Sequence, residues 1–120
     1  MQYMLLIYEP ESAFSSLSDD ERNAMLGEYF AFTNAIRESG HYRAGDALQP
    51  VGTATTVRVK EGRTLLTDGP FAETREQLGG YYLVEAKDID EACAIAARIP
   101  ASRSGSIEVR PVMVFDAAPT

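Results

Sequence analysis

The sequence predicts a single α+β domain, and three patterns along the chain indicate this fold class. Two segments, 18–40 and 88–100, carry apolar residues at helical spacing behind capping residues. Strand-like composition occurs in four further segments: 2–8, 41–49, 80–86 and 106–115. Residues 54–67 read as a β-hairpin whose turn lies at Glu61-Gly62. The order strand, helix, strand, hairpin, strand, helix, strand predicts a ferredoxin-like split βαβ arrangement with an inserted hairpin.

The first strand-like segment predicts a sheet that is buried on both faces. Residues 2–8 place Tyr3, Leu5 and Ile7 on one side of a strand and apolar residues on the other side too. Two helices can cover only one face of such a sheet. We assign these residues to the second face: Met4, Leu6, Tyr8, Tyr82 and Val84. A second copy of the chain is the simplest cover for that face, so we expect a homodimer built as a dimeric α+β barrel.

Capping residues set the expected ends of both helices. Ser18 and Glu21 form a capping box ahead of the longer helix, and Gly40 is a suitable residue to end it. The core-facing residues of this helix follow spacings of four, three and four: Met25, Tyr29, Phe32 and Ile36. The second helix begins with the same cap pattern at Asp88, and we expect Pro100 to end it. Residues 10–18 are expected to form a loop.

Composition and charge restrict the class of protein. The chain has 120 residues, enough for one hydrophobic core, and its apolar content of 45% is ordinary for a globular protein. A net charge of −7 argues against a nucleic-acid partner, which needs clustered basic residues. With one histidine and one cysteine, we expect no internal disulfide, no metal site and no cofactor. The start of the chain lacks a basic segment, so we expect neither a signal peptide nor a membrane span, and a cytoplasmic location.

The stretch from Asp68 to Tyr82 concentrates turn residues and charges beyond what a chain reversal needs. Its informative residues are Asp68-Gly69-Pro70-Phe71, Glu73, Glu76 and Gly79-Gly80-Tyr81-Tyr82, followed near the end by Glu108-Val109-Arg110-Pro111. With these residues the chain resembles the YCII-related proteins, also called DGPF-domain proteins. The resemblance covers nearly the whole chain and implies the dimeric α+β barrel fold. We therefore expect one domain at 1–116 and a C-terminal tail at 117–120.

The last strand-like segment places a charged pair on one face. Because strand period is two, Glu108 and Arg110 point the same way, opposite the apolar set that begins with Ile107. The apolar set should face the helices, which sends the charged pair toward the space between the two sheets or its rim. Arg110 could bind an anionic ligand with both arms of its guanidinium. The alternative is a structural ion pair with Glu108 or with a carboxylate of the 68–78 loop.

The 68–78 loop supplies further candidates for a site. Asp68 either holds the turn through a hydrogen bond to its own backbone or acts as a general acid or base. Glu73 and Glu76 lie close enough in sequence to join it in binding a ligand. Phe71 either packs the loop onto the core or contacts the ligand. Tyr81 and Tyr82 alternate faces, and we assign Tyr82 to the ligand-binding set.

His41, the only histidine, follows Gly40 at the end of the longer helix. In that place it can simply complement the helix dipole. It is also the side chain whose unperturbed pKa lies nearest neutrality. Related branches of the YCII superfamily have a His–Asp pair proposed as the active site. The resemblance therefore suggests His41 and Asp68 as a catalytic pair.

Two functions from different classes fit these observations. The first is a small-molecule-binding protein that acts as a cofactor-free acid/base lyase or isomerase on a small anionic or aromatic metabolite. The second is a non-catalytic ligand-binding or regulatory accessory protein, because DGPF-type members resemble domains found beside sigma-factor-like regulators. A purely structural dimer is a third reading. The substrate is not encoded in any motif that the sequence displays.

Overall fold

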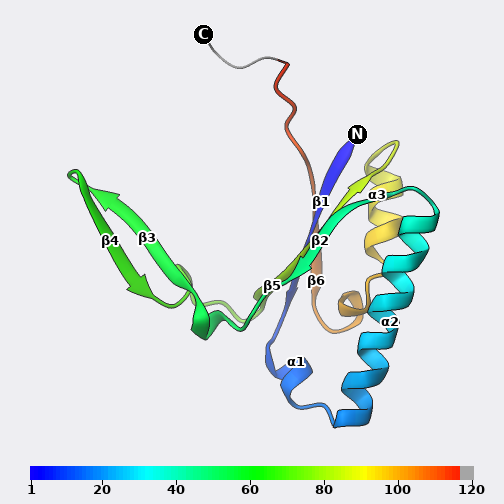
Figure 1. Cartoon of the computed structure of the whole chain (residues 1–120), viewed down its shortest axis with the longest axis horizontal. Coiled ribbons are helices and arrows are strands. Elements are labelled where there is room, and N and C mark those ends of the chain that lie inside the picture. Colours follow the sequence, from blue (N-terminus) through cyan, green and yellow to red (C-terminus); the bar gives the residue numbers. More distant parts are fainter. Residues whose placement is uncertain (117–120) are drawn as a thin grey trace.

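A computed structural model describes residues 1–116 of the chain, and the tail expected at 117–120 lies outside the described residues. The elements in chain order are β1 (Gln2–Glu9), α1 (Ser12–Ser15), α2 (Asp19–Glu38), β2 (Tyr42–Ala47), η1 (Val51–Thr53), β3 (Thr55–Lys60), β4 (Arg63–Asp68), β5 (Gln77–Glu85), α3 (Ile89–Ala96), η2 (Pro100–Arg103) and β6 (Ser106–Pro111). A four-stranded antiparallel sheet has the order β2-β5-β1-β6, and β3 pairs with β4 alone. Helices α2 and α3 lie on one side of the larger sheet (Figure 1). This is the predicted α+β split βαβ fold with an inserted hairpin.

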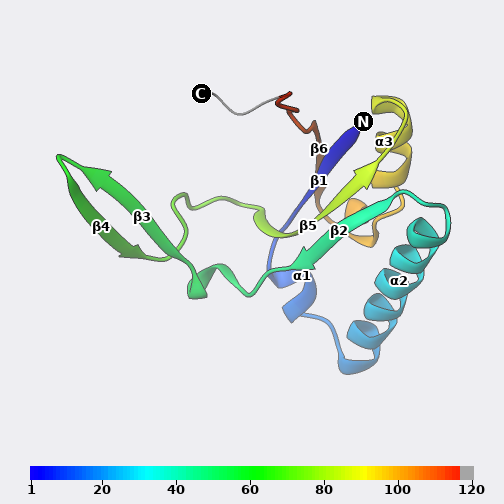
Figure 2. The same ribbon diagram turned by 45° about the horizontal axis from the view of Figure 1, so that its top comes forward.

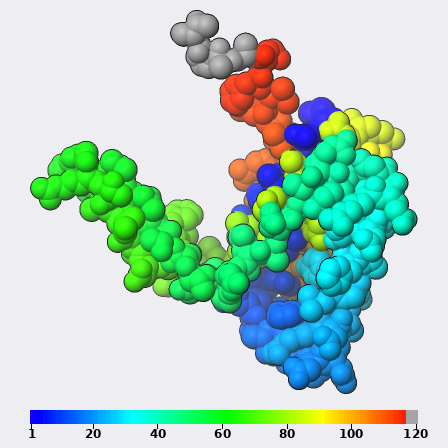
Figure 3. Space-filling view, viewed as in Figure 1, coloured from blue at the N-terminus to red at the C-terminus, as the bar shows by residue number. Residues whose placement is uncertain are grey.

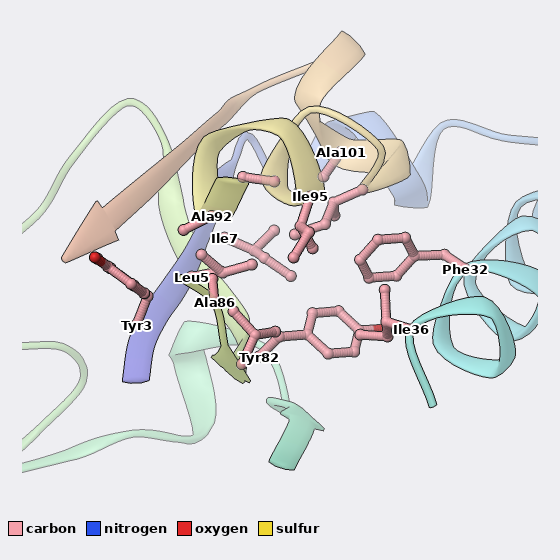
Figure 4. Close-up of a cluster of buried hydrophobic side chains, with 13 residues drawn as sticks. Tyr3, Leu5, Ile7, Phe32, Ile36, Tyr82, Ala86, Ala92, Ile95 and Ala101 are labelled. Atoms are coloured by element: carbon pink, nitrogen blue, oxygen red, sulfur yellow. The ribbon is translucent and has the colours of Figure 1, made fainter. Parts of the chain in front are cut away.

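The hydrophobic core lies between this sheet and the two helices (Figure 4). On β1 the buried side chains are Tyr3, Leu5 and Ile7, as predicted. Tyr82 and Val84 were assigned to the opposite face, and this assignment is wrong. In the antiparallel pair of β1 and β5, Leu5 lies opposite Tyr82 and Tyr3 opposite Val84. Directly paired residues share a face, so both β5 side chains enter the core.

The sheet face opposite the helices (the open face) carries the other set of alternating residues. It includes Met4, Leu6 and Tyr8 of β1, each partly exposed. In the β1–β6 pair, Arg110 lies opposite Met4 and Glu108 opposite Leu6. The prediction that this charged pair points away from the helices is therefore confirmed.

Helix α2 begins at the predicted capping box. The Ser18 hydroxyl accepts a hydrogen bond from the Glu21 amide at 3.2 Å, and the Glu21 carboxylate accepts one from the Ser18 amide at 3.0 Å. Gly40 follows the helix with φ 81°, a left-handed conformation that glycine adopts at little cost. Phe32 and Ile36 are the buried residues of the predicted stripe.

Four elements differ from the sequence prediction, and the first is β5, which begins at Gln77 rather than at residue 80. The expected loop at 10–18 contains the short helix α1. Helix α3 ends at Ala96, before Pro100, which instead starts η2; Ile99 is extended, as a residue before proline prefers. Strand β6 ends at Pro111 rather than at residue 115, because its partner β1 begins at Gln2 and offers no backbone further on.

The β3–β4 hairpin projects from the body of the domain as an arm (Figures 1 and 2). Its turn lies at Glu61 and Gly62, as predicted, and both have positive φ, 53° and 77°. The radius of gyration of the Cα trace is 16.8 Å. A compact domain of this length would have a radius of about 14 Å. The arm therefore lies clear of the core and projects on the side of the sheet opposite the helices.

Candidate functional site

A cavity of about 800 Å³ lies on the helix side of the sheet, between α2, α1 and the strands β2 and β5. We call it the α2–β2 cavity. Its walls are mainly apolar and include Phe14, Met25, Leu26, Phe30, Leu48 and Leu78. A cavity of this size and character is typical of small-molecule sites.

Among the residues that line the α2–β2 cavity, Tyr29, Thr33 and Tyr82 carry hydroxyl groups. The Tyr82 hydroxyl lies 2.8 Å from Thr33 Oγ1, and the Tyr82 ring packs edge-on against Phe32 at a centroid distance of 5.1 Å. Burial raises the pKa of Tyr82 above its usual value. Burial, with the negative charge of Glu9, raises the pKa of Tyr29 to about 12. Both phenols therefore stay protonated at neutral pH and can donate a hydrogen bond.

One guanidinium lies at the wall of this cavity. The Arg37 guanidinium carbon sits 4.6 Å from the centre of the Tyr42 ring, and both residues line the cavity. A cation over an aromatic face is held by the ring quadrupole. Because Arg37 lies one helical turn beyond Thr33, α2 presents a hydroxyl and a positive charge on the same side. This pair can bind an oxygen-rich or anionic group.

The carboxylates that line the cavity each accept a hydrogen bond from a neighbouring group of the protein. Glu9 accepts one from the Ser104 hydroxyl at 2.8 Å, and Glu11 accepts one from a backbone amide at 2.7 Å. Asp46 accepts one from the Tyr81 hydroxyl at 2.6 Å. These contacts hold the cavity walls in place. They favour a structural role for the carboxylates over one as a freely moving general base.

Asp68 ends β4 at the root of the arm and is exposed. The next residue, Gly69, has φ 100° and donates its N–H to the Ala54 carbonyl at 2.7 Å. The Thr56 hydroxyl donates to the Gly69 carbonyl at 2.8 Å. The Asp-Gly pair thus closes the root of the arm. The acid/base role of Asp68 stays a prediction.

Arg110 lies on the open face, where its guanidinium donates to the Glu108 carboxylate, with Nε 3.1 Å from Oε2. Glu108 raises the pKa of Arg110. Arg110 and Glu108 therefore form the structural ion pair that was the alternative to ligand binding. The predicted ligand contact of Arg110 stays a prediction, and neither Arg110 nor Asp68 lines the α2–β2 cavity.

His41 lies where the end of α2 meets the start of α3. Its Nδ1 is 2.6 Å from the Ser39 hydroxyl, and its Nε2 is 3.2 Å from Glu91 Oε1. This chain of contacts ties the two helices together on the helix side of the sheet. Asp68 belongs to the arm, which projects from the other side (Figure 1). A single chain therefore does not bring His41 and Asp68 together.

The remaining predicted site residues divide between loop and cavity. Phe71 is 79% exposed, so the expectation that it packs the loop onto the core is wrong for the single chain. Glu73 is exposed in the loop, and Glu76 accepts a hydrogen bond from the Ser106 hydroxyl at 2.9 Å, which fastens the loop to β6. Tyr82 is the one predicted residue that lines the α2–β2 cavity.

The sequence analysis placed Tyr29 on the core-facing stripe of α2 but did not identify the other polar residues that this helix contributes to the cavity, which are Thr33, Asn34 and Arg37. Tyr29, Thr33 and Arg37 are spaced four residues apart along the helix. Such a row lies on one side of a helix. The signal was available, because polar groups repeating every four residues beside a core-facing stripe indicate a helix face that lines a polar space.

The fold and the cavity together define the class: a ferredoxin-like α+β domain of the dimeric α+β barrel class, with a cavity between its long helix and its sheet. The chain belongs to the YCII-related domain family, whose model matches residues 1–116. It is 36% identical over 117 residues to an uncharacterized protein of Rhizobium meliloti (strain 1021), which covers 96% of this chain and 94% of that protein.

A solved structure with the same fold is 5-chloro-2-hydroxyhydroquinone dehydrochlorinase (TftG) from Burkholderia phenoliruptrix AC1100, in complex with 2,5-dihydroxybenzoquinone. The TM-score is 0.55, the sequence identity is 11%, and the match covers 94% of each chain. At this identity the similarity concerns the fold alone. In residues 1–116 no helix is long and apolar enough to span a membrane.

Proposed function

We propose that this protein binds a small ring compound bearing oxygen substituents in the α2–β2 cavity. The observation that carries the proposal is the pairing of apolar walls with the Tyr82–Thr33 hydroxyl pair and the Arg37 guanidinium in a cavity of about 800 Å³. Apolar walls take the ring, and a few polar groups fix its orientation. The fold neighbour was solved with such a ring compound, 2,5-dihydroxybenzoquinone, which supports this choice of ligand class.

The positions of the polar groups suggest how the ligand is oriented. The protonated phenol of Tyr82 donates to an oxygen substituent on the ring, and Arg37 pairs with a carboxylate or an ionised hydroxyl of the same ligand. A hydrogen bond to a charged group contributes more than one between neutral groups. A ligand with an anionic oxygen should therefore bind more tightly than its neutral analogue.

The proposal includes a homodimer formed through the open face. Its support is the row of apolar residues Met4, Leu6 and Tyr8, which the helices leave uncovered.

Acid/base catalysis is a second candidate function, favoured by the fold neighbour's being a dehydrochlorinase. In that case Asp68 would move a proton, with Arg110 and the loop carboxylates as its expected helpers. Asp68→Asn should then abolish turnover of a compound that still binds.

Titration calorimetry with 2,5-dihydroxybenzoquinone and a set of hydroxybenzoic acids tests the binding proposal. Arg37→Gln should weaken binding of the acids by roughly 10-fold or more, because a hydrogen bond to a charged group is lost, and should change neutral analogues little. Tyr82→Phe should weaken both groups by about 2- to 12-fold.

Arg98→Gln is the matched control. Arg98 also stacks on an aromatic ring, that of Phe32 at 5.7 Å, but it does not line the α2–β2 cavity. Binding should be unchanged in this variant. Equal affinities across Arg37→Gln, Tyr82→Phe and wild type would contradict the assignment of the site.

A further inference from the structure

Within residues 1–116 the β3–β4 arm makes its strand pairing only within itself, and it presents two chemically different faces. On one face lie Val57, Val59 and Leu66, which are 60%, 70% and 68% exposed. In the hairpin register Val57 is opposite Leu66, so these side chains form one apolar surface. The other face carries the three basic side chains of the arm, Arg58, Lys60 and Arg63, around Leu65. The arm is therefore an amphipathic hairpin.

A hairpin of this kind needs a partner surface. An isolated two-stranded hairpin is marginally stable in water, and an exposed apolar strand edge invites pairing with another chain. The arm extends the molecule to 48 Å along its longest axis, against 18 Å along its shortest. The arm extends away from its own domain, so packing within a single chain does not explain its position.

The space beside the arm is hollow. Figure 3 shows a concavity between the arm and the segment that follows β6. Its two rims carry exposed apolar residues, since Met113, Val114 and Phe115 are 74%, 78% and 77% exposed. The arm lies on the side of the sheet that the helices leave uncovered (Figure 1). Arm, open face and the segment after β6 thus border one recess.

The charges of the chain favour a second copy as the occupant of this recess. The arm, residues 55–68, carries three basic and two acidic side chains, a net charge of +1. Since the whole chain carries −7, the rest of it carries −8. A basic arm reaching from one copy meets an acidic body in the other, and this offsets the repulsion between two acidic domains.

We propose that the arm of each copy packs on the body of a second copy, with its apolar face buried against that partner and its basic side chains at the edge of the contact, near the partner's acidic body. This inference deepens the proposed homodimer and rests on it. It also gives the Asp68-Gly69 pair a role, because the hydrogen bonds of Gly69 to Ala54 and Thr56 fix the direction in which the arm leaves the domain. The partner that the arm recognises is another copy of this chain.

Sedimentation velocity at micromolar concentration, with the full chain, tests the inference. The double variant Val57→Asp with Leu66→Asp should raise the dimer dissociation constant by about 100-fold or more, because uncompensated charge is buried against the partner. Both side chains are exposed in the single chain, so the domain should melt cooperatively as before. Ile89→Asp is the control, since Ile89 is 43% exposed on the helix side and its exchange should leave the dimer intact.

A photo-reactive benzoyl-phenylalanine in place of Val59 provides a second measurement. Irradiation should give a covalent species of twice the chain mass. If the double variant dimerises like the wild type and position 59 gives no cross-link, the proposed contact of the arm is wrong. The dimer through the open face would still be possible. A wild-type monomer at these concentrations overturns both. Loss of the dimer in the double variant together with the cross-link supports the proposed contact of the arm.

Discussion

Replacing Gly45 by alanine should distort the inner wall of the α2–β2 cavity. Gly45 lies opposite Tyr82 in the β2–β5 pair. A Cβ at Gly45 would lie 2.8 Å from Tyr82 Cδ1 and 3.1 Å from the Tyr81 carbonyl oxygen. The Tyr82 ring has little freedom to retreat, because it packs on Phe32 and its hydroxyl bonds Thr33. The added methyl group therefore has to move the ring or the strand.

The magnitude follows from the cost of overpacking. Inserting a methyl group into a packed site costs about 1–3 kcal/mol of unfolding free energy. For a domain of this size, 1 kcal/mol corresponds to roughly 4 °C, so Gly45→Ala should lower Tm by roughly 4–12 °C. Thermal melts followed by circular dichroism measure this change. Calorimetry should show weaker ligand binding, because the displaced phenol belongs to the proposed site.

Gly52→Ala is the matched control for this experiment. Nothing lies within 4 Å of a Cβ at Gly52, and its φ is not in the left-handed range, so its Tm should stay near that of the wild type. In a Tyr82→Leu background the cost of Gly45→Ala should fall by more than half, since the clashing ring atom is gone. A Gly45→Ala variant that melts like the Gly52→Ala variant would refute the reasoning.

Two further predictions concern the core and the capping box. Tyr29, whose pKa is raised from 10 to about 12, should titrate late when its absorbance near 295 nm is followed against pH. The higher pKa of Tyr29 in the folded state contributes stability that is fully present below pH 10. This contribution is lost as pH rises from 10 through 12. The Tm of Tyr29→Phe should therefore fall less steeply than that of the wild type over this range. Ser18→Ala should lower Tm by about 4 °C, since a lost N-cap costs about 1 kcal/mol; an unchanged Tm would mean that the Ser18–Glu21 box contributes nothing.

The sequence predicted the fold wherever a local pattern had a single reading. The Ser18 capping box, the Glu61-Gly62 turn and the alternation of β6 all depend on near neighbours, and all are confirmed. The face of Tyr82 was wrong because alternation shows which residues of a strand share a side and does not show which side it is. That choice depends on the pairing of β5 with β1, which no local pattern encodes.

The candidate site was harder to predict for a related reason. The turn residues and charges after Asp68 suggested a ligand site, whereas the structure places Gly69 at the root of the arm with hydrogen bonds to Ala54 and Thr56. The cavity is made by α2 and β2, whose polar residues Thr33 and Arg37 lie within an ordinary helix pattern. Turn residues such as glycine and proline show clearly in a sequence, whereas a cavity between a helix and a strand leaves no comparable sequence pattern.

Strand β5 contributes residues both to the cavity and to the open face. Gly79 and Gly80 at its start determine which of its residues face each side. Register in the β1–β5 pair shifts between Ile7 and Tyr8, which leaves Gly79 without a direct partner, as a β-bulge does. At Gly80 a Cβ would lie 2.9 Å from the Asp46 carbonyl oxygen, so β2 can approach only a glycine there. Together the two glycines determine which of the residues that follow face the helices. A slip of one residue would turn Tyr82 away from Phe32 and Thr33, so the Gly79-Gly80 pair supports both the proposed ligand site and the proposed dimer surface.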